Sequence, residues 1–90
     1  MAWTIKYTAS AAKDIKKLDP QVQRKIRVFL EDDLTTLENP RSKGKGLTAN
    51  HAGLWRYRIG DFRLICNIED HQLIVLVLAA GHRKNIYGRY

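Results

Sequence analysis

The chain has 90 residues, of which 44% are hydrophobic, and its formal net charge is +7. This length supports one domain with a single core but not two, so residues 1–90 are interpreted as one domain. The positive field favours RNA or DNA as a partner over a merely solubilising surface or one that binds an acidic protein. Because the N-terminus lacks a secretory signal and no segment is long enough to span a membrane, we expect a cytoplasmic protein without membrane contact.

The first forty residues predict a short strand followed by two helices. Trp3 to Tyr7 alternates apolar and polar side chains, as a half-buried strand does. Thr8 is suited to cap a helix that runs to about Leu18. Asp19-Pro20 marks the start of a second helix, whose apolar residues recur every three or four positions until Asn39-Pro40 ends the pattern. The two helices predict a hairpin with one apolar side.

The second half of the chain predicts an exposed connector and then a three-stranded antiparallel meander. The connector, Arg41 to Gly53, has three glycines and two lysines and no apolar periodicity. The predicted strands are Leu54–Ile59, Phe62–Ile68 and Leu73 to about Ala79, with turns at Gly60-Asp61, of type II′, and at Asp70-His71. We therefore expect an α+β fold, in which the helical hairpin packs on one face of an antiparallel sheet.

Strand alternation places three arginines together on the face that the helices leave open. The Gly60-Asp61 turn pairs Arg58 with Arg63, and Arg56 lies on the same face two residues earlier. Like charges on neighbouring strands destabilise a sheet by about 0.2 to 1 kcal/mol per pair, and an anion held between them would offset that repulsion. Arginine's planar fork matches phosphate oxygens. The pattern therefore predicts a phosphate site.

The alternative is that these arginines form a solvated face and pair with Asp61 or Glu69. The stretch from Arg41 to Arg63 opposes this, because it has six basic residues and only one acidic residue. The apolar side chains expected beside Arg63 need a cover in a monomer, which the C-terminal tail or a partner segment could supply. They are Ile65, Ile74, Leu76 and Leu78.

The C-terminal tail, Gly81 to Tyr90, carries further candidate residues and is abruptly polar. Its first glycine lets the chain fold back toward the arginine face. Alternation assigns His82 to the face of Arg63, where positive charge favours a neutral imidazole that can accept a proton. A surface histidine without a role is the alternative. Tyr87 is a candidate either to stack on an unpaired base or to plug the edge of the core.

The sequence shows no metal-ligand spacing, phosphate-binding glycine loop or nucleophilic triad. We therefore expect no metal and no cofactor, and any hydrolysis would be metal-free. The single cysteine, Cys66, lies in an apolar run and is expected to be buried and inert.

The element order and two segments resemble the RelE/ParE toxin superfamily, and its RelE branch in particular. The segments are Gly53–Ile65 (GLWRYRIGDFRLI) and Gly81–Tyr87 (GHRKNIY). The resemblance implies a RelE-like toxin of a type II toxin-antitoxin system, an mRNA interferase. It implies a ribosome-dependent endoribonuclease that inhibits translation, in which the ribose 2′-hydroxyl attacks the scissile phosphate. It also implies a cognate RelB-like antitoxin that forms a hetero-oligomer with the toxin.

The resemblance also suggests roles for individual residues. Arg56 and Arg58 match two basic strand residues, which are lysines in the best-known members. A guanidinium is a poor general base, so Arg58 is expected to position and stabilise charge, leaving His82 or Tyr87 as the proton acceptor. Tyr87 resembles the functional tyrosine of the family, and Tyr90 could share its role. The candidate catalytic residues are Arg56, Arg58, Arg63, Arg83, Tyr87 and His82, and the candidate RNA-binding residues are Arg41, Lys43, Lys45, Lys84 and Arg89.

Two other functions fit the same fold. One is a ParE-like inhibitor of DNA gyrase, which binds its target and cuts nothing. The other is a non-catalytic RNA-binding module. Fold alone does not separate these functions, because one fold carries many activities.

Overall fold

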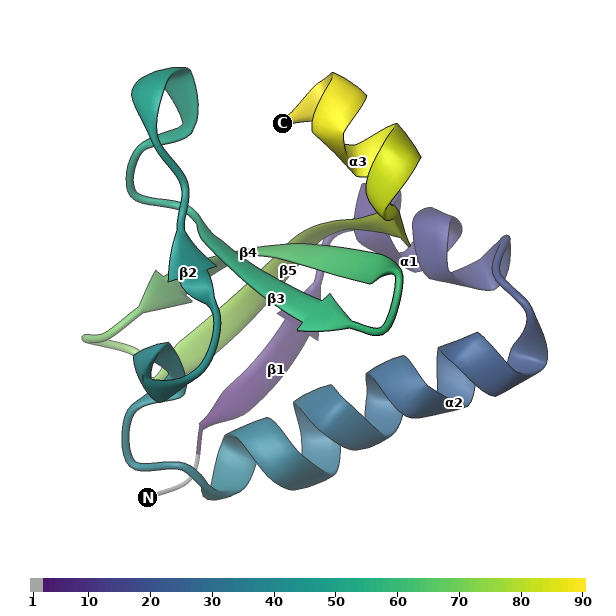
Figure 1. Cartoon of the computed structure of the whole chain (residues 1–90). Helices are drawn as coiled ribbons and strands as arrows, with labels where there is room; N and C mark the ends of the chain where they lie inside the picture. The colour runs from purple at the N-terminus through teal and green to yellow at the C-terminus, as the bar shows by residue number, and fades with distance from the viewer. Residues whose placement is uncertain (1–2) are drawn as a thin grey trace.

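The computed structural model, which describes residues 3–90, is built on a five-stranded sheet in the order β1-β5-β4-β3-β2 (Figure 1). The strands are β1 Thr4–Tyr7, β2 Lys45–Gly46, β3 Trp55–Ile59, β4 Phe62–Glu69 and β5 Ile74–His82. The α+β class, the N-terminal strand and the meander are confirmed. The sheet is mixed, because β1 lies outside the meander and pairs in parallel with β5.

The helical hairpin is confirmed, with shorter regular segments than the sequence predicts. α1 is Ala9–Lys16, and the Thr8 hydroxyl caps it by accepting a hydrogen bond of 3.0 Å from the Ala11 N–H. α2 is Pro20–Arg27, and the Asp19 side chain makes no capping hydrogen bond. Beyond α2 the helix continues as a wide π-helical segment, Val28–Asp33, and then a 3₁₀ turn, Leu34–Thr36.

The predicted connector contains three short elements. They are the 3₁₀ turns Pro40–Ser42 and Ala49–His51, and between them β2. β2 covers β3 only at Trp55 and Arg56, so the edge of β3 beyond Arg56 has no strand neighbour within residues 3–90.

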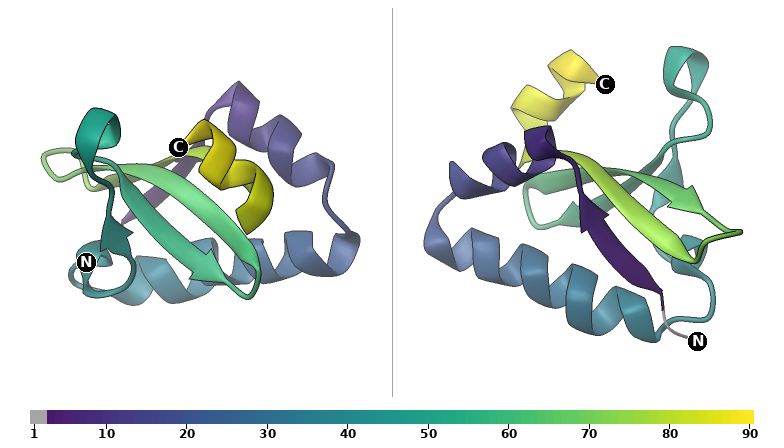
Figure 2. Two further views of the ribbon diagram at one scale, coloured as in Figure 1. Left: turned by 45° about the horizontal axis from the view of Figure 1, so that its top comes forward. Right: turned by 180° about the vertical axis from the view of Figure 1, so that it is seen from behind.

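The tail forms a third helix, which the sequence pattern did not predict. α3 is Arg83–Arg89, and it lies on the side of the sheet opposite to α2 (Figures 1 and 2). Its Ile86 is buried and packs with Ile65 and Ala79. The tail thus supplies part of the cover that the apolar side chains beside Arg63 require.

The main core lies between the sheet and the helical hairpin. Leu30 and Leu34, one helical turn apart, are fully buried with Val75 and Val77 of β5. β5 lies between β1 and β4, as its apolar character on both faces predicts. Within residues 3–90, no helix combines the length and the hydrophobicity needed to cross a bilayer.

The register of β3 on β4 is confirmed, and that of β5 contains a bulge. Ile65 pairs with Ala79 but Cys66 pairs with Val77, so Leu78 is an extra residue on β5. Alternation along β5 reverses there: Val77 and Ala80 belong to the main core, whereas Ala79 faces α3.

The bulge makes the predicted face of His82 wrong. His82 pairs with Phe62, and the two rings meet edge-on with centroids 5.5 Å apart. Gly81, not His82, is the residue opposite Arg63. His82 therefore lies on the face away from the three arginines.

Candidate functional site

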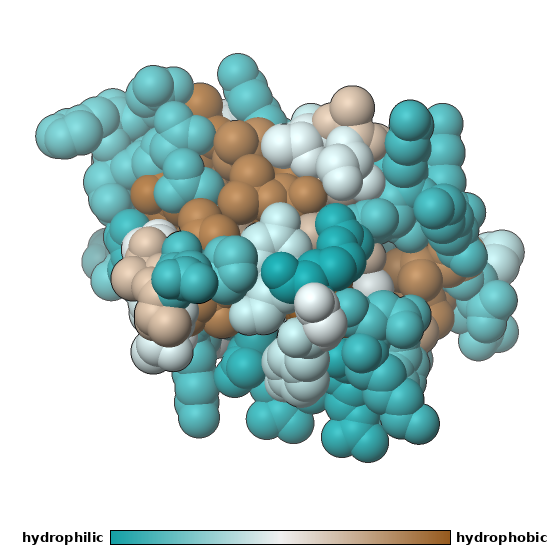
Figure 3. Space-filling view, turned by 90° about the horizontal axis from the view of Figure 1, so that it is seen from above, coloured by the Kyte–Doolittle hydropathy of each residue, from teal (hydrophilic) through white to brown (hydrophobic). Residues whose placement is uncertain are grey.

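The β3–β4 hairpin brings Arg56, Arg58 and Arg63 to one face of the sheet. Gly60 adopts the left-handed backbone conformation (φ 58°) that the first central position of a type II′ turn requires. The resulting register sets Arg58 directly opposite Arg63. In the view from the top of Figure 1, hydrophilic side chains surround an apolar strip on this side of the molecule (Figure 3).

Arg63 is a buried charge held by neutral acceptors, with an exposed fraction of 3%. Its Nη1 donates to the backbone oxygens of Gly60 (2.9 Å) and Phe62 (3.0 Å), and its Nε donates to the Tyr87 hydroxyl (3.2 Å). In the described part of the chain no carboxylate pairs with Arg63; the ion pairs found there join other residues. Arginine is almost never buried without a partner charge, so Arg63 is an unusual buried cation without a counter-ion in the described residues.

Arg56 converges on the same tyrosine from the neighbouring strand. Its Nη1 lies 3.4 Å from the Tyr87 hydroxyl, and its guanidinium and that of Arg63 each lie 5.9 Å from the centre of the Tyr87 ring. The Arg56 Nε is buried, and no hydrogen-bond acceptor reaches it from residues 3–90. Arg58 is exposed. The alternative was that Asp61 or Glu69 neutralises these arginines, and neither carboxylate forms an ion pair with them in the described residues.

Tyr87 extends from α3 over the arginines and is 52% exposed. The hydrogen bond from Arg63 lowers the pKa of the Tyr87 phenol, and the charges of Arg56, Arg63 and Arg58 act in the same direction, against partial desolvation. The phenolate is thus easier to form here than on a free tyrosine, and it stays open to solvent.

Four contacts position α3, and through it Tyr87. The Arg83 N–H donates to the Asp61 backbone oxygen (2.8 Å), and Ile86 is buried in the sheet. The His82 Nδ1 accepts a hydrogen bond from the Lys84 N–H (3.2 Å) and so caps the helix. At the other end, Arg89 pairs with Asp14 of α1 (3.2 Å).

The remaining predicted residues fall into two groups. Arg41 forms a two-pronged ion pair with Asp70 (2.8 and 3.0 Å), at the end of β4 far from Arg63, and this contact lowers the pKa of Asp70. Arg89 is likewise engaged by a carboxylate. The others are exposed and form no ion pair within residues 3–90: Lys43, Lys45, Arg83 and Lys84. Lys43 and Lys45 line a cavity with Arg56 and Arg58.

The sequence analysis missed the contacts that hold α3 on the sheet, and it missed that an aromatic side chain lines the cavity beside Lys43 and Lys45. The signal for α3 was weak, because Ile86 is the only aliphatic anchor in a seven-residue helix. Asp14 was also missed: it accepts hydrogen bonds from both Arg89 and the Ala80 N–H at the end of β5. That side chain is Phe29, whose place in the apolar helical pattern indicated only a core residue.

Residues 5–87 match the family described as "ParE toxin of type II toxin-antitoxin system, parDE". The chain is similar to Toxin RelG of Mycobacterium tuberculosis, with 34% identity over 89 residues that cover 99% of this chain and all of that protein. It is 32% identical to Toxin RelE of the same organism over 83 residues, 87% of this chain and 84% of that protein. The fold matches the crystal structure of the toxin-antitoxin complex RelBE2 from M. tuberculosis with a TM-score of 0.84 and 31% identity, over 92% of this chain and 93% of that chain.

Proposed function

We propose that this chain, which belongs to the RelE/ParE toxin superfamily and to its RelE-like branch, cleaves messenger RNA on the ribosome. One observation carries the proposal: Arg56 and Arg63, from adjoining strands, meet at the Tyr87 hydroxyl without a carboxylate among residues 3–90 to neutralise them. Positive charge that converges beside the exposed Tyr87 suits a phosphate that gains negative charge during reaction.

The arginines stabilise the transition state of phosphoryl transfer. Arg56, Arg58 and Arg63 hold the non-bridging oxygens of the scissile phosphate. Arg63 contributes most, since its bonds to the β3–β4 turn hold the guanidinium in place before the substrate arrives. Charge stabilisation by groups that are already in place commonly lowers the barrier more than any other effect in enzyme catalysis.

The chemical step is an in-line displacement at phosphorus. The ribose 2′-oxygen forms a bond to phosphorus as the bond from phosphorus to the 5′-oxygen breaks, leaving a 2′,3′-cyclic phosphate and a free 5′-hydroxyl. The 2′-hydroxyl proton passes to the Tyr87 phenolate. Arg83, next to the β3–β4 turn through its N–H bond to Asp61, stabilises charge on the departing 5′-oxygen, which takes a proton from water.

Tyr87 is a better supported proton acceptor than His82. The positive groups around Tyr87 lower the pKa of its phenol, whereas His82 caps α3 on the other face of the sheet. Arg58 serves to hold charge, since a guanidinium stays protonated in proteins. His82 therefore acts through the helix it caps.

The proposal is tested by mapping cleavage of a translated message, using purified ribosomes and primer extension. Arg63→Ala is expected to slow cleavage by about 10²- to 10³-fold, the usual cost of losing one donor to a developing oxyanion. Tyr87→Phe keeps the exposed ring but removes the hydroxyl, and about 10²-fold slower cleavage is expected from loss of the proton acceptor. Arg27→Ala on α2 removes an equal charge and should cleave like the wild type.

Circular dichroism of each variant separates loss of function from loss of fold. Wild-type cleavage rates in a folded Arg63→Ala protein contradict the proposal. If the wild-type protein binds RNA with a steep salt dependence and never cuts it, the chain is a non-catalytic RNA-binding module.

A ParE-like gyrase inhibitor is the second candidate, because the matching family model is that of a ParE toxin. Supercoiling by purified gyrase in the presence of the protein distinguishes the two. The proposal expects unchanged supercoiling and a cut message, and a gyrase inhibitor gives the reverse.

We also propose a RelB-like antitoxin as partner, in a hetero-oligomer. The support is the RelBE2 toxin-antitoxin complex, one chain of which shares this fold at 31% identity, and the net charge of +7, which an acidic partner would complement. Co-purification with the product of a neighbouring reading frame tests this, and a protein that elutes alone from such co-expression counts against it.

A further inference from the structure

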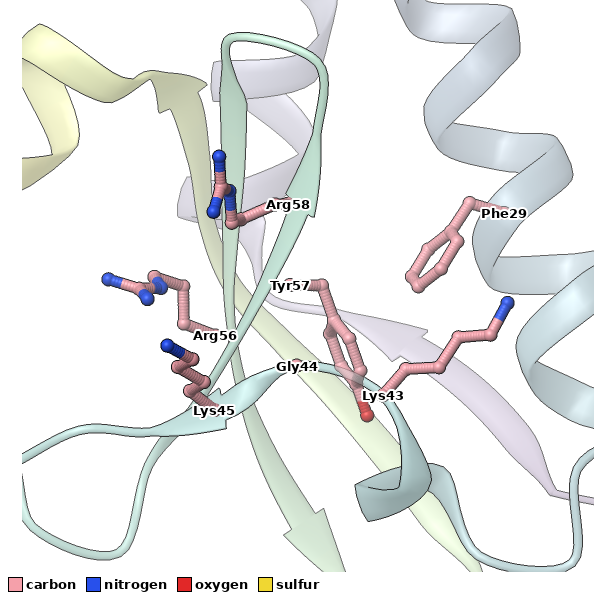
Figure 4. Close-up of a pocket in the computed structure, with 7 residues that line it drawn as sticks. All are labelled: Phe29, Lys43, Gly44, Lys45, Arg56, Tyr57 and Arg58. Carbon is pink, nitrogen blue, oxygen red and sulfur yellow. The ribbon is translucent and has the colours of Figure 1, made fainter.

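A cavity of about 320 Å³ lies across the uncovered edge of β3, next to the arginine face. Small-molecule sites begin at about 300 Å³, so the space suits one nucleotide-sized group. Figure 4 shows Phe29, Tyr57 and Lys43 on one side of β3, and Arg56, Arg58 and Lys45 on the other. The cavity therefore joins an aromatic wall to a positively charged wall.

The aromatic wall is formed by Phe29 and Tyr57. Their ring centroids are 5.3 Å apart and the rings are tilted by 58°. Phe29, from the π-helical segment after α2, is only partly buried. Part of its ring therefore faces the cavity, where Lys43 Nζ lies 5.9 Å from the ring centre.

The loop that closes the cavity is held in place by two aromatic side chains of β3. Trp55 Nε1 donates to the Lys43 backbone oxygen (2.7 Å), and the buried Tyr57 hydroxyl donates to the Pro40 oxygen (2.7 Å). Gly44 has a φ of 82°, and a Cβ there would lie 2.4 Å from the Arg56 oxygen. Only glycine allows the loop to approach β3 this closely.

Four positive charges line the cavity. They belong to Lys43, Lys45, Arg56 and Arg58. Across residues 3–90 none of the four is paired with a carboxylate, since the ion pairs found there involve Arg41 and Arg89. Their mutual repulsion favours an anionic occupant, and the aromatic wall favours one that also carries a flat ring.

We infer that this cavity is a nucleotide subsite for the RNA strand, which stacks one base on Phe29 and holds the adjoining phosphate between Lys45 and Arg58. The inference rests on the proposed function, because Arg56 and Arg58 belong to both sites. An RNA strand whose scissile phosphate lies at Arg63 reaches the cavity within a nucleotide or two by crossing the edge of β3. Lys43, on a flexible stem, moves from the ring to a phosphate as the base enters.

Base stacking on an aromatic ring accepts every base, because each base has a flat π-face. The subsite is therefore expected to anchor the strand and to contribute affinity. It confers little sequence preference.

The test uses the full-length protein and a short single-stranded RNA with 2′-O-methyl groups throughout, which blocks cleavage. The fluorescent base 2-aminopurine is placed at each position in turn, and stacking quenches its emission. Quenching is expected at one position beside the phosphate that Arg63 binds. Phe29→Leu keeps an apolar side chain but removes the π-face, and should abolish that quenching and weaken binding by about tenfold.

A second variant reports on charge without touching the core. Lys43→Ala should weaken binding and reduce the slope of log affinity against log salt by about 0.7, the value for one phosphate contact on a single strand. Lys13→Ala, which removes an equal charge from an exposed position on α1, should keep the quenching and most of the affinity.

Quenching at no position, or equal quenching in folded Phe29→Leu, overturns the inference. So does an outcome in which a poly-glutamate peptide, but not RNA, binds in a manner sensitive to Phe29→Leu, since the cavity would then be a protein-docking groove. The cleavage assay distinguishes the two proposals. If Arg63→Ala slows cleavage but Phe29→Leu and Lys43→Ala do not, only the subsite proposal is contradicted. If Phe29 quenches the fluorescence but the protein never cleaves RNA, only the proposed ribonuclease activity is contradicted.

Discussion

The two faces of the sheet bury different kinds of side chain. On the helix-covered face, Leu30, Leu34 and Val77 are fully buried among apolar neighbours. On the other face, α3 buries Ile65 and Ile86, but it also lies beside Arg63, a buried charge without a carboxylate partner in residues 3–90. The first face stabilises the fold, whereas the second holds a buried positive charge, which we propose binds an anion.

The helices on the two faces also differ in how they are held on the sheet. The hairpin of α1 and α2 is joined to the sheet by an extended apolar core, whereas α3 depends on one aliphatic side chain, one backbone hydrogen bond, a cap and an ion pair. Elements with few buried apolar contacts open more readily than the core. Tyr87 therefore sits on an element that is expected to open more readily than the hairpin of α1 and α2.

The largest effect is expected on the helix-covered face. Leu34→Ala removes a fully buried side chain from the main core and should lower the free energy of unfolding by about 2 to 5 kcal/mol. Val28→Ala, one and a half turns earlier and exposed, should change it by about 0.5 kcal/mol or less. Urea denaturation measures both, and equal midpoints for the two variants would mean that the core does not lie where the structure puts it.

A smaller and local effect is expected under α3. Ile86→Ala removes the main apolar anchor of that helix, and we expect a loss of about 2 kcal/mol, at the low end for such a truncation, because the sheet below stays covered on its other face. Hydrogen exchange should speed up in α3 before it does in β5. If the two elements exchange together, α3 is part of the main cooperative unit and the contrast between the faces is lost.

The cap of α3 separates two roles for His82. His82→Ala should weaken the helix by about 1 kcal/mol, whereas His82→Asn, which can still accept the Lys84 N–H bond, should keep both α3 and cleavage near wild type. Hydrogen exchange of α3 and the ribosomal cleavage assay are the readouts. Cleavage lost equally in both variants, with α3 intact, would return His82 to the role of general base.

The smallest effect is electrostatic and concerns the phenol of Tyr87. Positive charge stabilises the phenolate, so the pKa of Tyr87 should rise toward its ordinary value in Arg63→Ala, and rise less in Arg58→Ala. Titration of ¹³Cζ-labelled tyrosine by NMR measures this pKa, with the Tyr87 signal assigned from Tyr87→Phe. Arg27→Ala provides the control. A Tyr87 pKa that is unchanged without Arg63 means that the phenol and guanidinium are not in contact in solution.

The arginine face could be predicted from the sequence because the register of β3 on β4 is determined by neighbouring residues. A two-residue turn with glycine in first place sets Arg58 opposite Arg63, and a slip of one residue would turn the apolar side chains of β3 and β4 to the wrong side. The Thr8 cap was accessible for a similar reason, since it depends on residues three positions apart.

Features that depend on distant residues were not accessible. The extra residue at Leu78 reverses the face of everything after it on β5, and nothing in a uniformly apolar run reveals a bulge. α3 is shorter than a helix that is stable alone, so its formation depends on contacts with β5 and with Asp14, 75 residues before its partner Arg89.

The amino-acid order by itself determined the α+β class, the hairpin register and the three arginines on one face, because alternation and turn chemistry act over a few neighbouring positions. Only the tertiary structure decided that Tyr87 meets Arg56 and Arg63, that His82 does not join them, and that Phe29 faces a charged cavity. Those outcomes depend on how a bulged strand, a short helix and a glycine-bearing loop pack together, and packing is a property of contacts between residues far apart in the chain.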